Sequence, residues 1–201
     1  MPIELRATII DIRADAPRPS DVFLVDTNVL YWMCYSRARN PASARRQRAD
    51  AYSDYIKKAR QAQSTLQLCV ASLAELAHAI ERDECEIYNQ GLGASLSLKT
   101  YRRQKRDDVV EQVRSAWQLA ESITNGRVLP AAPVVSKLYD TLASAAVDGY
   151  DLLIYHAALS AGIRQILTDD ADYGEFADVQ IFTANDSLID LARAQNKLLR
   201  R

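Results

Sequence analysis

The sequence predicts an α/β protein, a three-layer α/β/α sandwich with a central parallel sheet. Two observations predict this fold class. Short apolar runs rich in β-branched residues, typical of strands buried on both faces, alternate along the chain with longer segments of helical periodicity. The chain also has 201 residues, 48% of them hydrophobic, which suffices for one domain with a sizeable core.

The composition excludes several classes of protein. Lys and Arg total 25 and Asp and Glu total 26, so contact with a nucleic acid must come from local basic patches rather than from the net charge. No stretch approaches the ~20 apolar residues that a transmembrane helix needs, and residues 1–15 contain no signal-peptide core. Three scattered cysteines indicate reduced thiols in a cytoplasmic protein. With only two histidines, any metal site must rely mainly on carboxylates.

The first 20 residues are expected to form an N-terminal arm, a loosely attached segment or strand, because the proline-broken segment 16–20 separates them from the rest of the chain. Residues 21–201 are expected to form a single domain. It opens with a buried strand over 22–25, Val-Phe-Leu-Val, and continues with a helix over 27–35.

Two helical elaborations, at about 40–65 and 91–125, lengthen this domain. The first is centred on a polar helix over 44–63. The second contains a helix over 99–123, in which apolar residues recur at helical spacing.

The remaining segments continue the alternation of strands and helices. Strands are predicted at 67–71, 164–168 and 179–183, with a short extended piece at 128–130. Helices are predicted at 72–87, 133–146 and 151–161, and from Asn185 or Asp186 to Leu199. Because helices separate successive strands, the strands are expected to run parallel.

Acidic residues recur at one structural place in this pattern. Asp26 follows the first strand, Glu75 begins the helix after the second, and Asp170 follows the third. Asp151 begins the helix that leads into the third strand, and Asp172 lies two residues after Asp170. Since the carboxyl ends of parallel strands share one edge of a sheet, these carboxylates are expected to converge.

Each acid also has a purely structural interpretation. Asp26 can be a helix N-cap, and Glu75 can close a capping box that starts at Ser72. Asp151 suits the first turn of a helix, and Asp170 suits a turn. A shared site explains all four positions at once, whereas the structural interpretations need four separate coincidences.

Several carboxylates with no basic residue among them repel one another unless some stay protonated or a divalent cation neutralises them. Oxygen ligands with retained waters are what Mg²⁺ or Mn²⁺ prefers. Such a metal can activate water and stabilise the charge that develops on a phosphodiester. The acids therefore predict metal-dependent phosphoryl hydrolysis.

Four segments resemble the four motifs of PIN-domain ribonucleases, in that family's order and over about residues 21–185. They are Val-Asp-Thr-Asn-Val-Leu (25–30), Ala-Ser-Leu-Ala-Glu-Leu (71–76), Asp-Leu-Leu-Ile-Tyr-His-Ala-Ala (151–158) and Leu-Thr-Asp-Asp-Ala-Asp-Tyr (167–173). The Asp-Thr-Asn after a strand and the Thr-x-Asp-x-Asp-aromatic ending are the specific parts. The resemblance implies the α/β/α fold, Mg²⁺ or Mn²⁺ as cofactor, and endonucleolytic cleavage of RNA by a metal-activated water.

Carried over by position, the resemblance also implies a set of site residues. The catalytic, metal-binding acids are Asp26, Glu75, Asp151 and Asp170, with Asp172 as a more variable fifth acid, and the supporting positions are Asn28 and Thr168. Many prokaryotic members, the VapC type, are toxins held inactive by a small antitoxin. An antitoxin and a second copy of the chain are therefore candidate partners besides RNA. The alternative is a PIN-fold module that binds RNA or protein without cutting.

The chain differs from compact toxins of this type in three features. It has the N-terminal arm, longer helical stretches, and a second acid, Asp169, beside Asp170. The Thr-x-Asp register favours Asp170 as the ligand.

Further polar residues have a functional and a structural interpretation. His78 follows the second acid in a Glu-x-x-His pair that could bind metal, and His156 could approach the site; packing is the alternative for both. Tyr31 and Tyr35 could stack on bases or fill the core. Two basic clusters could contact RNA phosphates or simply be solvated. The clusters are Arg37, Arg39, Arg45, Arg46 and Arg48, and Lys99, Arg102, Arg103, Lys105 and Arg106.

Overall fold

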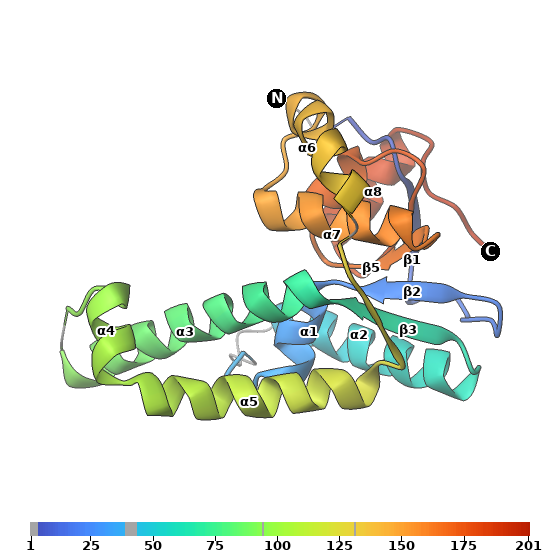
Figure 1. Cartoon of the computed structure of the whole chain (residues 1–201). Helices are drawn as coiled ribbons and strands as arrows, with labels where there is room; N and C mark the ends of the chain where they lie inside the picture. The colour runs from blue at the N-terminus through green and yellow to red at the C-terminus, as the bar shows by residue number, and fades with distance from the viewer. Residues whose placement is uncertain (1–3, 39–43, 94, 131) are drawn as a thin grey trace.

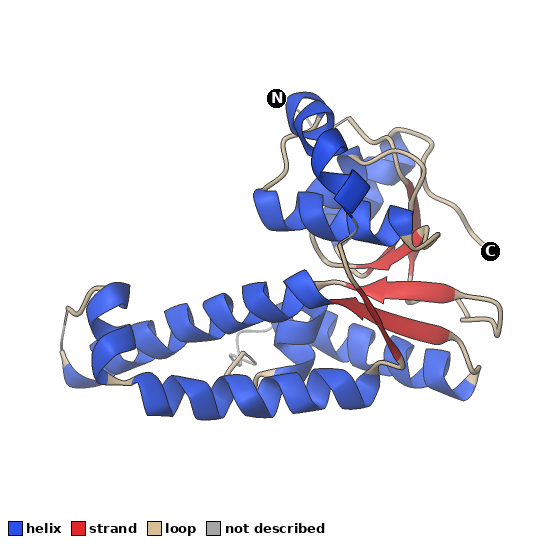
Figure 2. Cartoon of the chain, viewed as in Figure 1, coloured by secondary structure: helices blue, strands red, loops and turns tan. Residues whose placement is uncertain are grey.

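One parallel sheet forms the centre of the molecule. The computed structural model describes residues 4–38, 44–93, 95–130 and 132–201, without the side chains of 44–46 and 132–136. In this part of the chain, six strands pair in the order β1-β6-β5-β2-β3-β4, every pair parallel. Figure 2 shows strands, in red, between two groups of helices. The strands are β1 Thr8–Asp11, β2 Val22–Val25, β3 Thr65–Cys69, β4 Gly126–Val128, β5 Gln165–Leu167 and β6 Gln180–Thr183.

Helices connect the strands and cover the sheet. They are α1 Thr27–Cys34, α2 Ala44–Gln61, α3 Val70–Leu92, α4 Leu98–Gln104, α5 Arg106–Ile123, α6 Ala132–Ser144, α7 Gly149–Ser160, the 3₁₀ helix η1 Asp172–Glu175 and α8 Asp186–Ala194. None of the helices within the described residues combines the length and apolar character needed to cross a bilayer.

Alternating strand residues divide the core into two halves, one on each face of the sheet. Phe23 and Val25 point to the half that α1, α2, α3 and α5 cover, whereas Leu24 points to the half that α7 and α8 cover. This period of two is what a strand buried on both faces requires. The predicted three-layer α/β/α sandwich with a central parallel sheet is confirmed.

The second elaboration, which contains α4 and α5, forms a helical hairpin with α3 that extends beyond the sheet. α3 and α5 lie side by side, with α4 at their far end (Figure 1). A small separate core of Cys85, Tyr101 and Val109 fills this end. The helix predicted over 99–123 is in fact two helices, because the backbone at Lys105 leaves the helical conformation (φ −125°).

The segment expected to be a loosely attached arm is instead firmly part of the sheet. β1 forms the edge strand beside β6, with Ile9 opposite Ile181. Ile9 and Ile10 are buried on opposite faces. Ile9 also exchanges backbone hydrogen bonds with the C-terminal segment around Leu198. The proline-broken connection therefore separates two strands of one sheet.

Other boundaries also differ from the prediction. The strand expected over 67–71 ends at Cys69, since Val70 and Ala71 already belong to α3. α3 continues past the expected end at residue 87 to Leu92, where Gly93 adopts the left-handed conformation (φ 60°) that ends helices.

The last helix is shorter than expected. Asn185 caps α8, but the helix ends at Ala194 rather than at Leu199. Asn196 adopts a left-handed conformation (φ 55°) just beyond it. The chain then returns to β1.

Candidate active site

Strand order brings the first and last acidic motifs together. β2 and β5 are neighbours, with Val25 opposite Leu167, so the next residue of each strand reaches the carboxyl edge of the sheet beside the other. There the Thr168 hydroxyl donates a hydrogen bond of 2.7 Å to Asp26 Oδ2. Asp26 is only 2% exposed.

Asp26 occupies the N-cap position of α1, but its side chain makes no N-cap hydrogen bond. Its second oxygen, Oδ1, instead accepts a hydrogen bond of 3.1 Å from the hydroxyl of the buried Tyr173. Asp26 is therefore not only a helix cap, because both of its carboxylate oxygens make other contacts. Tyr173 is a contact that we did not predict, although this aromatic residue ends the fourth motif.

Glu75 does not close a capping box. α3 begins at Val70, and Cys69 is its N-cap residue. The hydroxyl of Ser72 is buried and has no hydrogen-bond partner among the described residues. The Glu75 carboxylate instead accepts a hydrogen bond of 2.5 Å from the Thr27 hydroxyl, at the start of α1. The contact fixes Glu75 beside the residue that follows Asp26.

Asp151 lies in the first turn of α7 and is 7% exposed. Asp148 caps this helix, because its Oδ1 accepts hydrogen bonds from the amides of Tyr150 and Asp151 at 2.7 and 3.0 Å. Asp148 is a further acid of this edge that the sequence analysis missed. Its position three residues before Asp151 is an ordinary N-cap signal that could have revealed it.

The loop after β5 carries the doubled acid. Thr168 Oγ1 accepts hydrogen bonds from the Asp170 amide at 2.9 Å and from Asn28 Nδ2 at 3.2 Å. Asp170 Oδ1 in turn accepts the Asp172 amide at 2.9 Å. Asn28 and Thr168 thus both organise the loop that presents these acids.

The two adjacent acids have different surroundings. Asp169 forms a 2.8 Å ion pair with Arg48 and accepts a hydrogen bond from the Tyr52 hydroxyl. Asp170 lies within electrostatic range of Asp26 and Asp151 instead.

Burial dominates the electrostatics of the acids. It raises the pKa of Asp26 to about 6, although the Thr168 hydrogen bond opposes the shift. Burial, followed by repulsion from neighbouring acids, raises the pKa of Asp151 to about 9. The pKa of Glu75 rises to about 7, again mainly through burial, and that of Asp172 rises for the same reason. No Lys or Arg among the described residues forms an ion pair with these acids.

The donor chemistry suits a hard divalent cation, because the site offers only carboxylate and hydroxyl oxygens and carries uncompensated negative charge. Within the described part of the chain, however, no three His, Cys, Asp or Glu side chains are arranged to hold a metal ion directly. This arrangement fits an ion held through one or two carboxylates and its own waters, which is the usual mode for Mg²⁺. It does not fit an ion enclosed by protein ligands.

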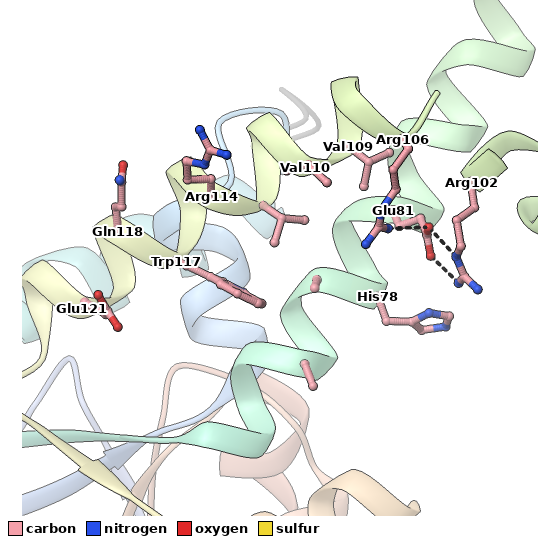
Figure 3. Close-up of a pocket in the computed structure, with 13 residues that line it drawn as sticks. His78, Glu81, Arg102, Arg106, Val109, Val110, Arg114, Trp117, Gln118 and Glu121 are labelled. Carbon is pink, nitrogen blue, oxygen red and sulfur yellow. Dashed lines mark hydrogen bonds and ion pairs between the residues drawn. The ribbon is translucent and has the colours of Figure 1, made fainter. Parts of the chain in front are cut away.

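Neither histidine joins the acids. His78 lines a groove of about 730 Å³ between α3 and α5, where Figure 3 shows it near the ion pair of Glu81 with Arg102. His156 is buried, and its Nε2 shares a hydrogen bond of 2.8 Å with the Thr141 hydroxyl of α6.

The two tyrosines that could have stacked on bases, Tyr31 and Tyr35, form hydrogen bonds with α3. The Tyr31 hydroxyl donates to Asp83, and that of the buried Tyr35 donates to Glu84. Both side chains therefore help to join α1 to α3.

Several residues of the basic clusters have partners within the protein. Arg37 pairs with Glu84, and Arg102 and Arg106 pair with the buried Glu81. Lys105 lies over the ring of Tyr88, 5.2 Å from its centroid. Arg39 and the side chains of Arg45 and Arg46 lie outside the described residues. Solvated or structural roles thus account for much of both clusters.

Comparison with known families identifies the family of the chain. The model of the PIN domain family matches residues 23–180, which include all four motifs. The chain belongs to the PIN domain family. PIN domains are generally nucleases that use divalent metals, so the carboxyl edge of this sheet is the expected place of a PIN site. No curated protein sequence matches the chain.

Solved structures share the PIN fold. VapBC2 from Rickettsia felis, bound to a promoter DNA fragment, is 13% identical with a TM-score of 0.50, over 80% of this chain and 96% of that chain. FitAcB from Neisseria gonorrhoeae is 18% identical (TM-score 0.46; 81% and 98% covered). Mycobacterium tuberculosis VapC20, a Sarcin-Ricin loop cleaving toxin, is 13% identical (TM-score 0.40; 72% and 86% covered). At 13% identity the similarity to VapBC2 concerns the fold alone. The similarities to FitAcB and VapC20 add nothing to that conclusion.

Proposed function

We propose that this PIN domain is a Mg²⁺- or Mn²⁺-dependent endoribonuclease. The observation that carries the proposal is the convergence of four carboxylates at one edge of the sheet, two of them buried and two half-buried, with no cationic partner among the described residues. These acids are Asp26, Glu75, Asp151 and Asp170, with Asp172 beside them and with Asn28 and Thr168 in supporting roles. Uncompensated negative charge in a buried site is costly unless the function needs it.

The chain's own residues hold the acids in place. Hydroxyl groups of Thr168 and Tyr173 fix both oxygens of Asp26, and Thr27 fixes Glu75. A bound Mg²⁺ or Mn²⁺ would neutralise these carboxylates, activate water and stabilise the charge on the phosphodiester. No side chain needs to form a covalent intermediate with the RNA.

The test is cleavage of varied single-stranded and structured RNAs with Mg²⁺ or Mn²⁺. Asp26→Asn keeps the shape of the side chain but removes its charge, and we expect cleavage to fall by at least ~10²-fold. Asp190→Asn, an exposed acid paired with Arg193 on α8, is the control that should cleave like the parent. RNAs left intact by the parent, or equal cleavage by Asp26→Asn, would contradict the proposal.

A second candidate is a PIN-fold module that binds RNA or protein without cutting. It is favoured by one observation, that the described acids are not arranged to enclose a metal. Calorimetric titration with Mn²⁺ separates the two functions. A nuclease should bind the ion at micromolar to millimolar concentration, whereas a non-catalytic module need not bind it.

We further propose that the chain acts as a toxin restrained by an antitoxin, on the ground of its family. Expression of the parent should then arrest growth, and expression of Asp26→Asn should not. Co-expression of a short protein encoded by a neighbouring gene, the candidate antitoxin, should relieve the growth arrest. We propose a second copy of the chain as another partner, and light scattering on the purified chain tests for this homodimer.

A further inference from the structure

Tyr52 of α2 reaches the ends of two strands with a single hydroxyl group. The side chain is fully buried. Its hydroxyl lies 2.9 Å from the carbonyl oxygen of Thr168, 3.0 Å from Asp169 Oδ1 and 3.0 Å from Thr183 Oγ1, and it accepts the amide of Ala184 at 2.9 Å. A phenol has one proton to donate and two lone pairs, so the Thr168 carbonyl oxygen and Asp169 Oδ1 share the proton, while the Thr183 hydroxyl and the Ala184 amide donate to the lone pairs. The Tyr52 hydroxyl thereby connects Thr168, the residue after β5, to the end of β6.

The amide, the carbonyl oxygen and the carboxylate of Asp169 all form hydrogen bonds. Its amide donates to Asn28 Oδ1 at 3.1 Å, and its carbonyl oxygen accepts from Asn185 Nδ2 at 2.8 Å. Its carboxylate accepts from Tyr52 and from Arg48 Nη1, the latter at 2.8 Å. Arg48 and Tyr52 lie four residues apart, on one face of α2, so one helix supplies both contacts.

The chain direction at this point decides which acid faces the site. Asp169 is turned toward α2, and its carboxylate is neutralised there by Arg48. Asp170 comes next, with its amide tied to Thr168 Oγ1, and interacts electrostatically with Asp26, Glu75 and Asp151. If Asp169 were released, the loop would lose the contacts that separate the two acids.

We propose that Tyr52 and Arg48 are positioning residues of the acidic site, in that they retain Asp169 on the α2 side and so orient Asp170 toward Asp26. This inference rests on the proposed nuclease function. It gives the first helical elaboration a role in the chemistry, although α2 contributes no acid to the site. A purely structural role would stabilise the fold without changing how the acids bind a cation.

The experiment compares two buried hydroxyl groups of the same helix. Tyr52→Phe removes the hydroxyl that touches the Thr168–Asp169 segment. Tyr55→Phe removes one that bonds to Asp15, on the connection between β1 and β2, and serves as the matched control. Mn²⁺ affinity by titration calorimetry, RNA cleavage and thermal unfolding are measured on the full chain for each variant.

We expect Tyr52→Phe to weaken Mn²⁺ binding ~10-fold, with a comparable loss of cleavage, as for other residues that orient ligands without touching the metal. Tyr55→Phe should lower the unfolding temperature similarly and leave Mn²⁺ affinity and cleavage unchanged. Arg48→Met should resemble Tyr52→Phe, and Arg48→Lys should partly restore both readouts, because it keeps the charge but not the geometry.

Parent-like Mn²⁺ affinity in both Tyr52→Phe and Arg48→Met would overturn the positioning role while leaving the nuclease proposal intact. Equal losses in Tyr52→Phe and Tyr55→Phe would overturn it too, since the effect would then be one of stability. A parent that neither binds Mn²⁺ nor cleaves RNA would overturn the proposed function, and the positioning role with it.

Discussion

Thr168 illustrates how much of the acidic edge depends on one hydroxyl group. Its Oγ1 donates to Asp26 and accepts from Asn28 and from the amide of Asp170. The residue is fully buried, so water cannot replace a lost contact. One atom therefore joins β2, α1 and the loop after β5.

Thr168→Val should be destabilising although it preserves the shape of the side chain. It leaves the Asp26 carboxylate without its closest donor, which should lower the free energy of unfolding by about 1–3 kcal/mol. Thr168→Ser keeps the hydroxyl and should stay close to the parent. Urea unfolding measures the stability, and RNA cleavage should fall only in the valine variant. If both variants behave alike, the hydroxyl has no such role.

The positions of the proposed site acids could be predicted because each depends only on the order of the strands. Asp26 and Asp170 follow strands, so their place at the carboxyl edge needs no knowledge of side-chain directions. The hydroxyl contacts of Tyr173 and Tyr52 could not be predicted in this way. Each depends on a side chain that crosses the core to a partner more than 100 residues away.

At the scale of single elements, the N-termini of α3 and α4 offer a direct comparison of two serines. Ser72 has the spacing of a capping box but a buried hydroxyl without a partner. Ser97 is a true N-cap, because its hydroxyl accepts the Thr100 amide at the start of α4.

Ser72→Ala should leave stability unchanged or raise it slightly, because it removes a buried polar group that bonds to nothing. Ser97→Ala should cost about 1 kcal/mol, the usual value for losing a cap. Urea unfolding at equilibrium measures both. A loss of stability in Ser72→Ala as large as in Ser97→Ala would show that the serine caps the helix after all.

Element boundaries were predictable where a local signal marks them. Asn196 could have marked the end of α8, since asparagine tolerates the left-handed conformation found there. The break between α4 and α5 at Lys105 could not be predicted in this way, since no Gly or Pro marks it. The place of β1 in the sheet was not predicted, because its partner strand, β6, lies about 170 residues away in sequence.

At the scale of the whole molecule, Arg201 ties distant parts of the chain together. Its guanidinium donates to Asp15 and Asp21, and it stacks on the Phe182 ring at 4.5 Å. Arg201→Ala would leave two buried carboxylates unpaired and should cost about 3 kcal/mol in urea unfolding. The exposed neighbour serves as control, and Arg200→Ala should stay within about 0.5 kcal/mol of the parent. Equal stability of the two variants would argue against a buried ion pair.

The stability of the metal-free protein should depend on the protonation of Asp26. Its pKa is raised from 3.8 to about 6 in the folded state, so the folded protein holds a proton that the unfolded chain releases. The stabilisation is therefore complete below about pH 4 and is lost as pH rises through 6.

Asp26→Asn carries no charge and escapes this loss. In the presence of a chelator at about pH 8, the variant should be more stable than the parent by about 2–3 kcal/mol, and the difference should vanish near pH 4. Mg²⁺ or Mn²⁺ should stabilise only the parent. Thermal unfolding across pH, with and without the ion, measures both effects, and a difference independent of pH would contradict the assigned cause.

The strand order also has a consequence for folding of the chain during translation. β5 lies between β2 and β6, so the partner that completes the surroundings of Asp26 emerges about 140 residues after it. Contacts this distant in sequence form late and slowly. A ribosome-bound chain that ends before residue 165 lacks β5, Thr168 and Asp170, so its acidic site is incomplete. The proposed nuclease would thus acquire activity only after the segment that carries Thr168 and Asp170 has been synthesised.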